Sequence, residues 1–308
     1  DFNSKSLEQL YEMLVYANSE RYFILYEAIR KGAPLEKLKE LTSVKMYYLQ
    51  QMAELVELEE KMLKTIGQIP ADDLLIQAKK DGFADKYLAK ILHVSEKAIR
   101  TRREELGVTE GWLAVPVSGK ENTNYYYSTY NDTDKAPVST NPKKIMILGG
   151  GPNRIGQGIE FDYCCCHAAM ALTQMGYETV MVNCNPETVS TDYDTSTKLY
   201  FEPVSLEDVL QIYRKENPAG VIVQFGGQTP LNIARELADQ GVKILGTSID
   251  SIDTAEDRDL FRKMMENLEI PMPESGMASN FEEAKEIADR IGYPIMIRPS
   301  FVLGGRGM

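Results

Sequence analysis

The chain has 308 residues, of which 43% are hydrophobic and 26% charged; this is an ordinary globular composition and excludes a disordered or collagen-like protein. No apolar run approaches the ~20 residues of a membrane-spanning helix, and a formal net charge of −12 argues against binding to a nucleic-acid backbone. The charge is −3 over residues 1–136 and −9 over residues 137–308, which predicts two parts of different character.

The first part is predicted to be helical. From Leu7 to Leu106 the apolar residues recur at helical spacing, and β-branched clusters are scarce. The pattern predicts a first helix with Ala17 and Tyr22 on its inner face, and a short helix opened by Pro34. The predicted helices span residues 7–30, 35–41, 44–66, 72–80 and 85–106, the last with a break near residues 93–94.

Residues 87–100 of this part resemble a helix-turn-helix. Ser95 is placed to cap the second helix, which carries Arg100, Arg102 and Arg103. One interpretation is a recognition helix for the major groove, and the other is the solvated face of a helical packing unit. The acidic charge and the lack of flanking basic residues favour the packing unit.

Residues 107–141 differ in character from the helical part. They are rich in Asn, Ser, Thr, Asp and Pro, and they include the tyrosine run 125–127. This composition predicts a linker or an extended surface segment, with tyrosines that pack it onto a neighbouring domain.

At Lys143 the pattern changes to alternating strands and helices. Short apolar runs bounded by glycine are typical of buried parallel strands, and the alternation predicts a parallel sheet covered on both faces. The predicted strands are residues 145–148, 179–182, 220–225, 242–245 and 294–299, and the predicted helices are residues 162–175, 231–240, 257–268 and 282–291.

The glycine-rich turn 149–158 suggests a dinucleotide site but departs from its pattern in two places. The third glycine of the dinucleotide pattern is replaced by Arg154, and the acid expected after the second strand is replaced by Asn183. An NAD-dependent enzyme is therefore disfavoured. The glycines still allow the backbone to approach another group closely.

Three segments are predicted to meet at the carboxyl edge of the sheet, where ligands of such sheets bind. They are the turn 149–158, a second glycine loop at 226–230, and residues 183–187. We expect Glu160 and Glu187 to line a pocket or passage there, although a lone carboxylate of this kind is commonly a helix cap or an ion-pair partner.

Two further features bear on chemistry. Cys164, Cys165, Cys166 and Cys184 lack the spacing of a zinc site or of a disulfide framework, which favours reduced thiols packed in a cytosolic interior. Arg298 precedes the Gly-Gly-Arg-Gly sequence at 304–307, where loop amides and a guanidinium suit phosphate groups, with an ordinary surface turn as the alternative.

These residues together resemble one family, the large chain of carbamoyl-phosphate synthase. The resemblance covers nearly the whole chain, more loosely before Lys143, and residues 45–49 and 117–122 depart from the family pattern. The motifs that carry it are residues 149–163, 182–194, 225–230, 255–258 and 298–308.

The resemblance implies a fold in three parts. Residues 1–136 would form a helical oligomerisation domain with an extended linker, and residues 137–256 a parallel-sheet, Rossmann-like pre-ATP-grasp domain. Residues 257–308 would be the truncated start of an ATP-grasp domain. The chain opens at Asp1 and stops inside a glycine loop, so we expect it to be the central piece of a longer protein.

The resemblance also implies the activity of that longer protein. It would be a cytoplasmic ligase that makes carbamoyl phosphate from bicarbonate, glutamine-derived ammonia and two ATP, for arginine and pyrimidine biosynthesis. Its partners would be a glutaminase small chain and further copies of itself, with no nucleic acid and no membrane. Mg²⁺, or Mn²⁺, would accompany ATP.

Site residues follow from the resemblance position by position. Arg258 and Arg298 match residues that contact ATP, and Gly304 and Gly305 match the loop that closes over its phosphates. Gly158, Glu160 and Glu187 match positions near the internal passage for carbamate.

No catalytic residue and no metal ligand matches within the 308 residues. We therefore expect this chain alone neither to turn over nor to bind ATP tightly, and micromolar Mg·ATP binding in calorimetry would contradict that expectation.

Two alternatives stay open at this point. One is another ATP-grasp ligase, such as a biotin-carboxylase-like protein, against which the motif at 149–163 argues. The other is a regulatory module in residues 1–136, either a DNA-binding helix-turn-helix or an association domain, and the family's use of this domain for self-association favours association.

Overall fold

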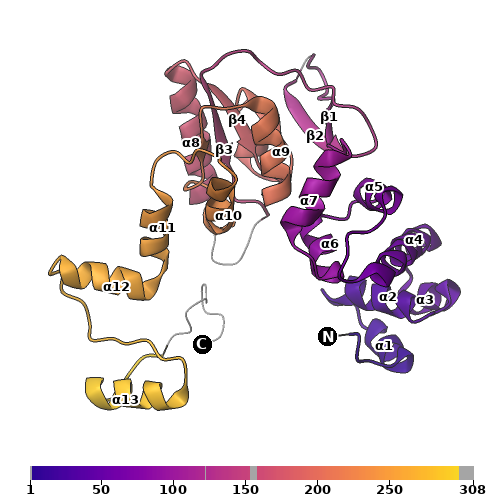
Figure 1. Ribbon diagram of the computed structural model, residues 1–308, viewed down its shortest axis with the longest axis horizontal. Coiled ribbons are helices and arrows are strands. Elements are labelled where there is room, and N and C mark those ends of the chain that lie inside the picture. The colour runs from indigo at the N-terminus through magenta and orange to yellow at the C-terminus, as the bar shows by residue number, and fades with distance from the viewer. Residues whose placement is uncertain (1, 122, 153–157, 298–308) are drawn as a thin grey trace. The chain divides into compact units, whose positions relative to one another are not determined.

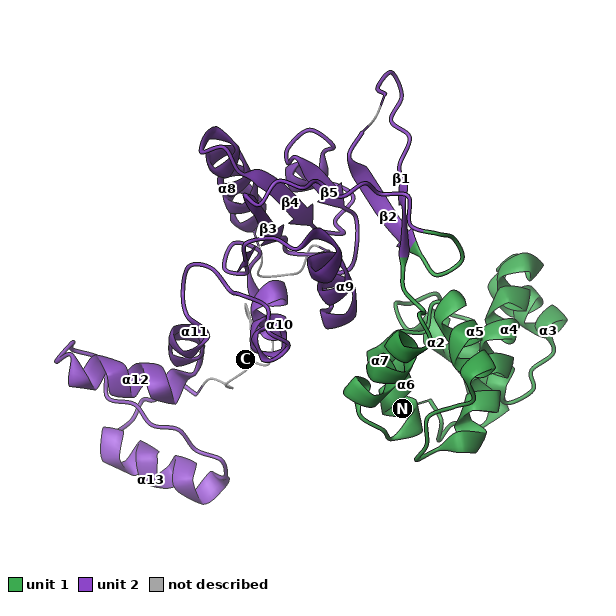
Figure 2. Cartoon of the chain, turned by 45° about the horizontal axis from the view of Figure 1, so that its top comes forward, with its two compact units in different colours: residues 1–110, 129–133 green, residues 111–128, 134–308 purple. Residues whose placement is uncertain are grey.

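The computed structural model describes residues 2–121, 123–152 and 158–297. The chain folds as two compact units (Figure 2). Unit 1 comprises residues 1–110 and 129–133, and unit 2 comprises residues 111–128 and 134–308.

Unit 1 is helical, as predicted (Figure 1). The predicted helix 7–30 is wrong in one respect, because it is two helices. The Asn18 side chain accepts a hydrogen bond from the backbone of Glu20, a local turn that competes with the helix. Ala17 and Tyr22 are consequently exposed instead of buried. The helices are α1 (Leu7–Leu14), α2 (Arg21–Arg30), α3 (Leu35–Thr42), α4 (Met46–Met62), the 3-10 turn η1 (Leu63–Thr65), α5 (Asp72–Lys80), α6 (Asp85–Leu92) and α7 (Glu96–Glu105).

The helix ends follow from local sequence signals. Ser6 forms a capping box with Gln9 at the start of α1. His93 adopts a left-handed conformation between α6 and α7, and the predicted cap Ser95 accepts a hydrogen bond from the backbone of Ala98. Gly82, at φ 89°, ends α5.

Two apolar clusters fill unit 1, one under α1 to α4 and one under α4 to α7. The buried carboxylate of Glu59 lies on α4, which contributes to both clusters. It accepts hydrogen bonds of 2.8 Å from Tyr26 of α2 and from Tyr87 of α6, and it pairs with Arg30. This network ties the two halves of the helical unit together.

The arginines of α7 do not form a recognition surface. Arg103 is buried and pairs with Asp85 at 3.0 Å, and Arg100 is buried as well. Arg102 pairs with Asp72 at 2.7 Å and with Glu105 at 2.8 Å. Arg102 and Arg103 therefore connect α7 to α5 and α6, and Arg100 pairs with Glu96 within α7.

Unit 2 is built on a six-stranded sheet in the order β1-β2-β5-β4-β3-β6. Adjacent strands from β2 to β6 are parallel. The segment predicted as a linker supplies β1 and β2, because its tyrosines pack into the edge of the sheet. The strands are β1 (Gly111–Ala114), β2 (Tyr125–Thr129), β3 (Lys144–Leu148), β4 (Glu178–Val182), β5 (Lys198–Tyr200) and β6 (Val221–Ile222).

Helices cover both faces of this sheet, as predicted (Figure 1). On one face, α8 (Glu160–Gln174) packs Cys165 and Ala169 against Ile147 and Met181. On the other face, α9 (Leu206–Glu216) and α10 (Gln228–Asp239) share a larger core with the strands.

All four cysteines are free, as predicted. The prediction of an interior location holds for the buried Cys165 and Cys166. Cys184 is partly buried and Cys164 is exposed, because it points away from the sheet-facing side of α8.

The predicted strands near the carboxyl end are shorter than expected. The strand predicted at 220–225 stops at Ile222, because the side chain of Gln224 makes the contacts that a strand backbone would make, to the backbones of Val223 and Leu245. The strand predicted at 242–245 is a single bridge between Val221 and Ile244.

The described part of the strand predicted at 294–299 has no strand conformation, and a strand requires a hydrogen-bonded neighbour. The chain before this segment forms α11 (Ile249–Glu256), α12 (Arg258–Asn267) and α13 (Phe281–Ile291). None of the helices within the described ranges is long and apolar enough to cross a membrane.

Candidate functional site

A cavity of about 350 Å³ lies where the two glycine loops and the end of β4 meet. The sequence predicted this meeting point at the carboxyl edge of the sheet. Of the predicted residues, Gly158 and Glu187 line the cavity. The described lining residues are Gly150, Gly151, Pro152, Gly158, Ile159, Phe161, Asp162, Asn183, Asn185, Glu187, Thr188 and Gly226.

Asn183 is the residue that organises this edge, and sequence reasoning missed its role. Its side chain is 1% exposed. The Oδ1 atom accepts hydrogen bonds of 2.9 Å from the backbones of Gly151 and Cys184, and Nδ2 donates to Ser190 Oγ at 2.9 Å. The only available signal was its position after a buried strand, where it replaces the acid of a dinucleotide site.

The glycines of the loops are required by contacts within the protein. A methyl group at Gly149 would overlap the Asn183 side chain, and one at Gly226 would lie 2.5 Å from the Leu148 carbonyl oxygen. A methyl group at Gly150 would lie 3.1 Å from the Gly226 carbonyl oxygen. The two loops pack backbone to backbone, which only glycine permits.

The remaining predicted carboxylate, Glu160, is placed differently from Glu187. Glu160 is the first residue of α8, and its carboxylate lies directly against Gly158. A negative charge is favourable at this end of the helix. Glu187 lines the cavity, and the backbone N–H of Glu187 donates to Asn185 Oδ1 at 3.1 Å. Glu187 is therefore a lining residue of the cavity, and Glu160 lies beside the lining residue Gly158.

The thiols near this edge are not nucleophiles. Burial and the neighbouring Asp162 raise the pKa of Cys166 to about 12. Burial also raises the pKa of Cys165 and of Cys184. Since the thiolate is the reactive form, these cysteines stay protonated and inert near neutral pH.

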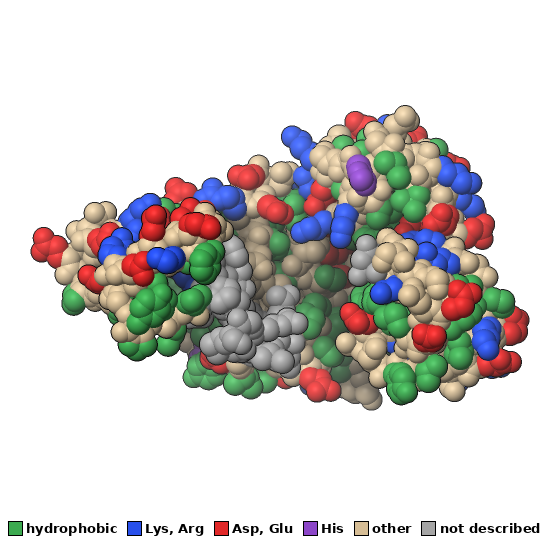
Figure 3. All heavy atoms as spheres, turned by 90° about the horizontal axis from the view of Figure 1, so that it is seen from below, with side chains coloured by type: hydrophobic (Ala, Val, Ile, Leu, Met, Phe, Trp, Pro, Cys, Tyr) green, Lys and Arg blue, Asp and Glu red, His purple; other side chains and the backbone are tan. Residues whose placement is uncertain are grey.

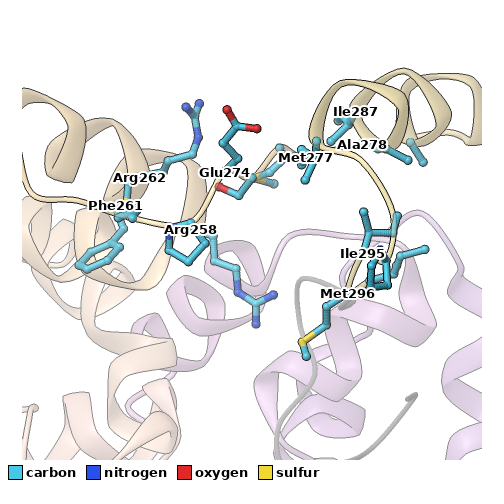
Figure 4. Close-up of a pocket in the computed structure, with 18 residues that line it drawn as sticks. Arg258, Phe261, Arg262, Glu274, Met277, Ala278, Ile287, Ile295 and Met296 are labelled. Atoms are coloured by element: carbon cyan, nitrogen blue, oxygen red, sulfur yellow. The ribbon is translucent and has the colours of Figure 1, made fainter.

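A second cavity, of about 580 Å³, lies among α12, α13 and the segments 272–278 and 294–297 (Figure 4). The side chain of Arg258 extends toward Met296, and Arg262 points the other way. Phe261, Met277 and Ile287 contribute apolar walls. Hydrophobic side chains also gather on the surface of this segment (Figure 3), where Met296 is 93% exposed.

The other residues predicted to bind ATP, namely Arg298, Gly304 and Gly305, lie outside the described residues. Among the residues that the structure does describe, no group of three or more His, Cys, Asp or Glu side chains is arranged to hold a metal ion. The second cavity is lined by two arginines, Arg258 and Arg262, and by an apolar wall; a guanidinium suits a phosphate and an apolar wall suits a planar base.

The chain thus has three successive parts. They are a helical unit, a parallel sheet with a cavity at its carboxyl edge, and a following segment with an arginine-bearing pocket. They match three consecutive domain families: the carbamoyl-phosphate synthetase large chain oligomerisation domain over residues 1–107, the carbamoyl phosphate synthase preATP-grasp domain over 141–254, and the carbamoyl-phosphate synthase L chain ATP binding domain over 257–308. The chain belongs to the family of the carbamoyl phosphate synthase large chain.

Curated relatives are similar over almost the whole chain. The carbamoyl phosphate synthase large chain of Archaeoglobus fulgidus is 51% identical over 98% of this chain and 29% of that protein. The large chain of Pseudomonas syringae pv. tomato is 51% identical over 99% of this chain and 28% of its own length, and that of Halomonas eurihalina is 50% identical over 100% and 29%. The chain thus spans less than a third of the length of these relatives.

Among solved structures, N5-carboxyaminoimidazole ribonucleotide synthetase from Thermus thermophilus is similar over 49% of this chain and 37% of its own. The TM-score is 0.38 and the sequence identity 21%.

Proposed function

We propose that the chain serves in a carbamoyl phosphate synthase large chain, a ligase that uses two ATP to convert bicarbonate and glutamine-derived ammonia to carbamoyl phosphate. The observation that carries this proposal is the succession of three domains of that enzyme along the chain, over residues 1–107, 141–254 and 257–308. The product would supply arginine and pyrimidine biosynthesis in the cytoplasm.

Within this function, the cavity at the carboxyl edge of the sheet serves as the passage for carbamate. Carbamate decomposes quickly in water, so its transfer requires a sheltered route. The glycine loops form part of its wall, with Gly158 and Glu187 on its lining and Glu160 against Gly158. Its size, about 350 Å³, is ample for a small planar anion.

The second cavity serves the nucleotide. Arg258 would hold an ATP phosphate, and Arg298 with the glycines Gly304 and Gly305 would complete the phosphate contacts. The apolar wall beside Arg258 would take the base. Phosphoryl transfer depends on positioning and on neutralisation of charge, which Mg²⁺ or Mn²⁺ supplies with ligands from elsewhere in the enzyme.

The passage is tested by obstruction in a full-length enzyme that contains these residues. Gly158→Leu places a bulky side chain on the cavity lining, and Ala171→Leu, at an exposed position of α8, is the control. We expect Gly158→Leu to abolish formation of carbamoyl phosphate while bicarbonate-dependent ATP hydrolysis continues. Wild-type product formation by Gly158→Leu would contradict the proposal.

We also propose that unit 1 mediates self-association. A glutaminase small chain is the second proposed partner of the whole enzyme. Five aromatic side chains at the beginnings of α2 and α4 and just before α2 are 58–76% exposed, and Arg21 joins these regions by a hydrogen bond to the Thr42 carbonyl. Such exposure is typical of an interaction surface. The five are Tyr16, Tyr22, Phe23, Tyr47 and Tyr48.

Sedimentation velocity of the 308-residue chain tests the association. We expect the sedimentation coefficient to rise with concentration, and the double substitution Tyr47→Ser and Tyr48→Ser to abolish that rise. A coefficient independent of concentration in the wild type would refute self-association through this unit.

A further inference from the structure

The frame around the first cavity is held by one buried amide. The Asn183 side chain forms hydrogen bonds to three segments. They are the first glycine loop at Gly151, the exit of β4 at Cys184, and the 3-10 turn η2 (Val189–Thr191) at Ser190. The carboxamide uses its oxygen twice as acceptor and its nitrogen once as donor. Since Asn183 is almost fully buried, losing its side chain leaves buried backbone N–H groups without their acceptor, which is costly.

The frame continues around the cavity from Ser190. The backbone N–H of Ser190 donates to Asp162 Oδ2 at 3.1 Å, which connects η2 to the first turn of α8. On the other side, Thr229 Oγ1 donates to the Gly150 carbonyl oxygen at 2.7 Å and connects α10 to the loop. Five segments are therefore linked by these hydrogen bonds, namely the glycine loop, the exit of β4, η2, α8 and α10, with Asn183 at the centre.

An amide suits this position better than a carboxylate. Aspartate could accept the two backbone N–H groups, but it lacks the N–H that Asn183 donates to Ser190 Oγ. It would also bury a second negative charge near Asp162, which shares Ser190 as a partner. The residue that excludes a dinucleotide site is thus the residue that holds the loop.

We propose that Asn183 is a positioning residue for carbamate transfer: it holds the glycine loop against η2, so that the passage stays closed to water. This inference rests on the proposed function of the cavity. Without the Asn183 side chain, the loop at 149–152 separates from η2, water enters, and carbamate is lost before its phosphorylation. ATP is then consumed without product.

The test uses a full-length enzyme that contains these residues, with two readouts. One is the ratio of ATP hydrolysed to carbamoyl phosphate formed, which reports loss of carbamate. The other is ATP synthesis from ADP and carbamoyl phosphate, the reverse of the last step, which needs no passage. Asn183→Ala and Asn183→Asp are compared with Asn232→Ala, an exposed asparagine of α10.

We expect Asn183→Ala to raise the ratio several-fold and to leave the reverse reaction within twofold of the wild type. Asn183→Asp should also raise the ratio relative to the wild type, because a carboxylate lacks the N–H donated to Ser190 Oγ and adds a buried charge near Asp162. Asn232→Ala should match the wild type in both readouts.

A wild-type ratio in both Asn183 variants overturns the inference. A parallel loss of both reactions overturns it too, since the residue would then only stabilise the fold. Obstruction by Gly158→Leu separates the two proposals: if that variant still makes product, the passage itself fails, and if it blocks product while the Asn183 variants lose no carbamate, only this inference fails.

Discussion

Glu202 provides the sharpest test of the electrostatics of unit 2. It lies two residues after the end of β5 and is 4% exposed, and its Oε1 atom has no hydrogen-bond partner among the described residues. Burial and, to a smaller degree, the nearby Asp208 raise the pKa of Glu202 to about 8, against the opposing effect of hydrogen bonds from Ser128. The folded protein therefore keeps this carboxyl group protonated at neutral pH.

The sign of the pH dependence follows from the raised pKa. In the unfolded chain the carboxyl group ionises near its ordinary value of 4.5. The stability contributed by the protonated group is therefore fully present below pH 4.5 and is lost as the pH rises to about 8. A rise of this size corresponds to at most about 5 kcal/mol of unfolding free energy between these limits.

Glu202→Gln removes the ionisation and retains the shape. We expect the variant to gain stability relative to the wild type as the pH rises from 5 to 8, with a constant difference above pH 8. Near pH 5 the wild type should be the more stable by about 1–3 kcal/mol, because the glutamine amide buries an additional unpaired donor.

Trp112 makes the measurement specific to unit 2. It is the single tryptophan of the chain, and it is buried in β1 against Tyr200. Urea unfolding followed by its fluorescence from pH 5 to pH 9 gives the free energies, with Glu236→Gln on the exposed face of α10 as the control. Parallel pH profiles for Glu202→Gln and the wild type would refute the reasoning.

Three further predictions concern the packing of both units. Asp85→Asn removes the carboxylate that pairs with the buried Lys79 and Arg103, so thermal unfolding followed by circular dichroism should show unit 1 destabilised by about 3–5 kcal/mol; an unchanged transition would argue against the buried triad. Burial and the bond to Glu59 raise the pKa of Tyr87 to about 12. Its contribution is present below pH 10 and lost toward pH 12, so Tyr87→Phe should flatten the alkaline fall in stability, and an equally steep fall would contradict this. Gly149→Ala should destabilise unit 2 by about 1–3 kcal/mol in urea through overlap with Asn183, and wild-type stability would show that the loop adjusts freely.

Local sequence signals predicted most of the helices and the two central strands. The helices 72–80 and 35–42 follow directly from apolar spacing with a proline or glycine at an end, and the runs 145–148 and 179–182 are buried strands as predicted. These signals work because burial of one face leaves a periodic trace in the sequence. The sequence did not predict the break between α1 and α2 at residues 15–20. Its cause is a single side chain, Asn18, which accepts a hydrogen bond from the backbone N–H of Glu20.

The candidate site was predicted in outline for a similar reason. Parallel strands bring their carboxyl ends to one edge, so the order of strands and loops along the chain is enough to place the glycine loops and Glu187 together. The strand-like tyrosine segment 125–129 could not be assigned to the sheet, because its pairing with β5 joins residues more than 70 positions apart. The edge strands and β6 depend on such partners.

The sequence by itself determined the helical and α/β halves, the edge of the sheet at which the site lies, and the family, because periodicity, glycine positions and long motifs are written locally along the chain. Only the tertiary structure decided that Asn183 turns inward to Gly151 and Ser190, that Arg103 is buried on Asp85, and that a polar segment completes the sheet. Each of these depends on which distant group meets a side chain when the backbone closes around it, and a hydrogen bond between distant segments leaves no periodic trace.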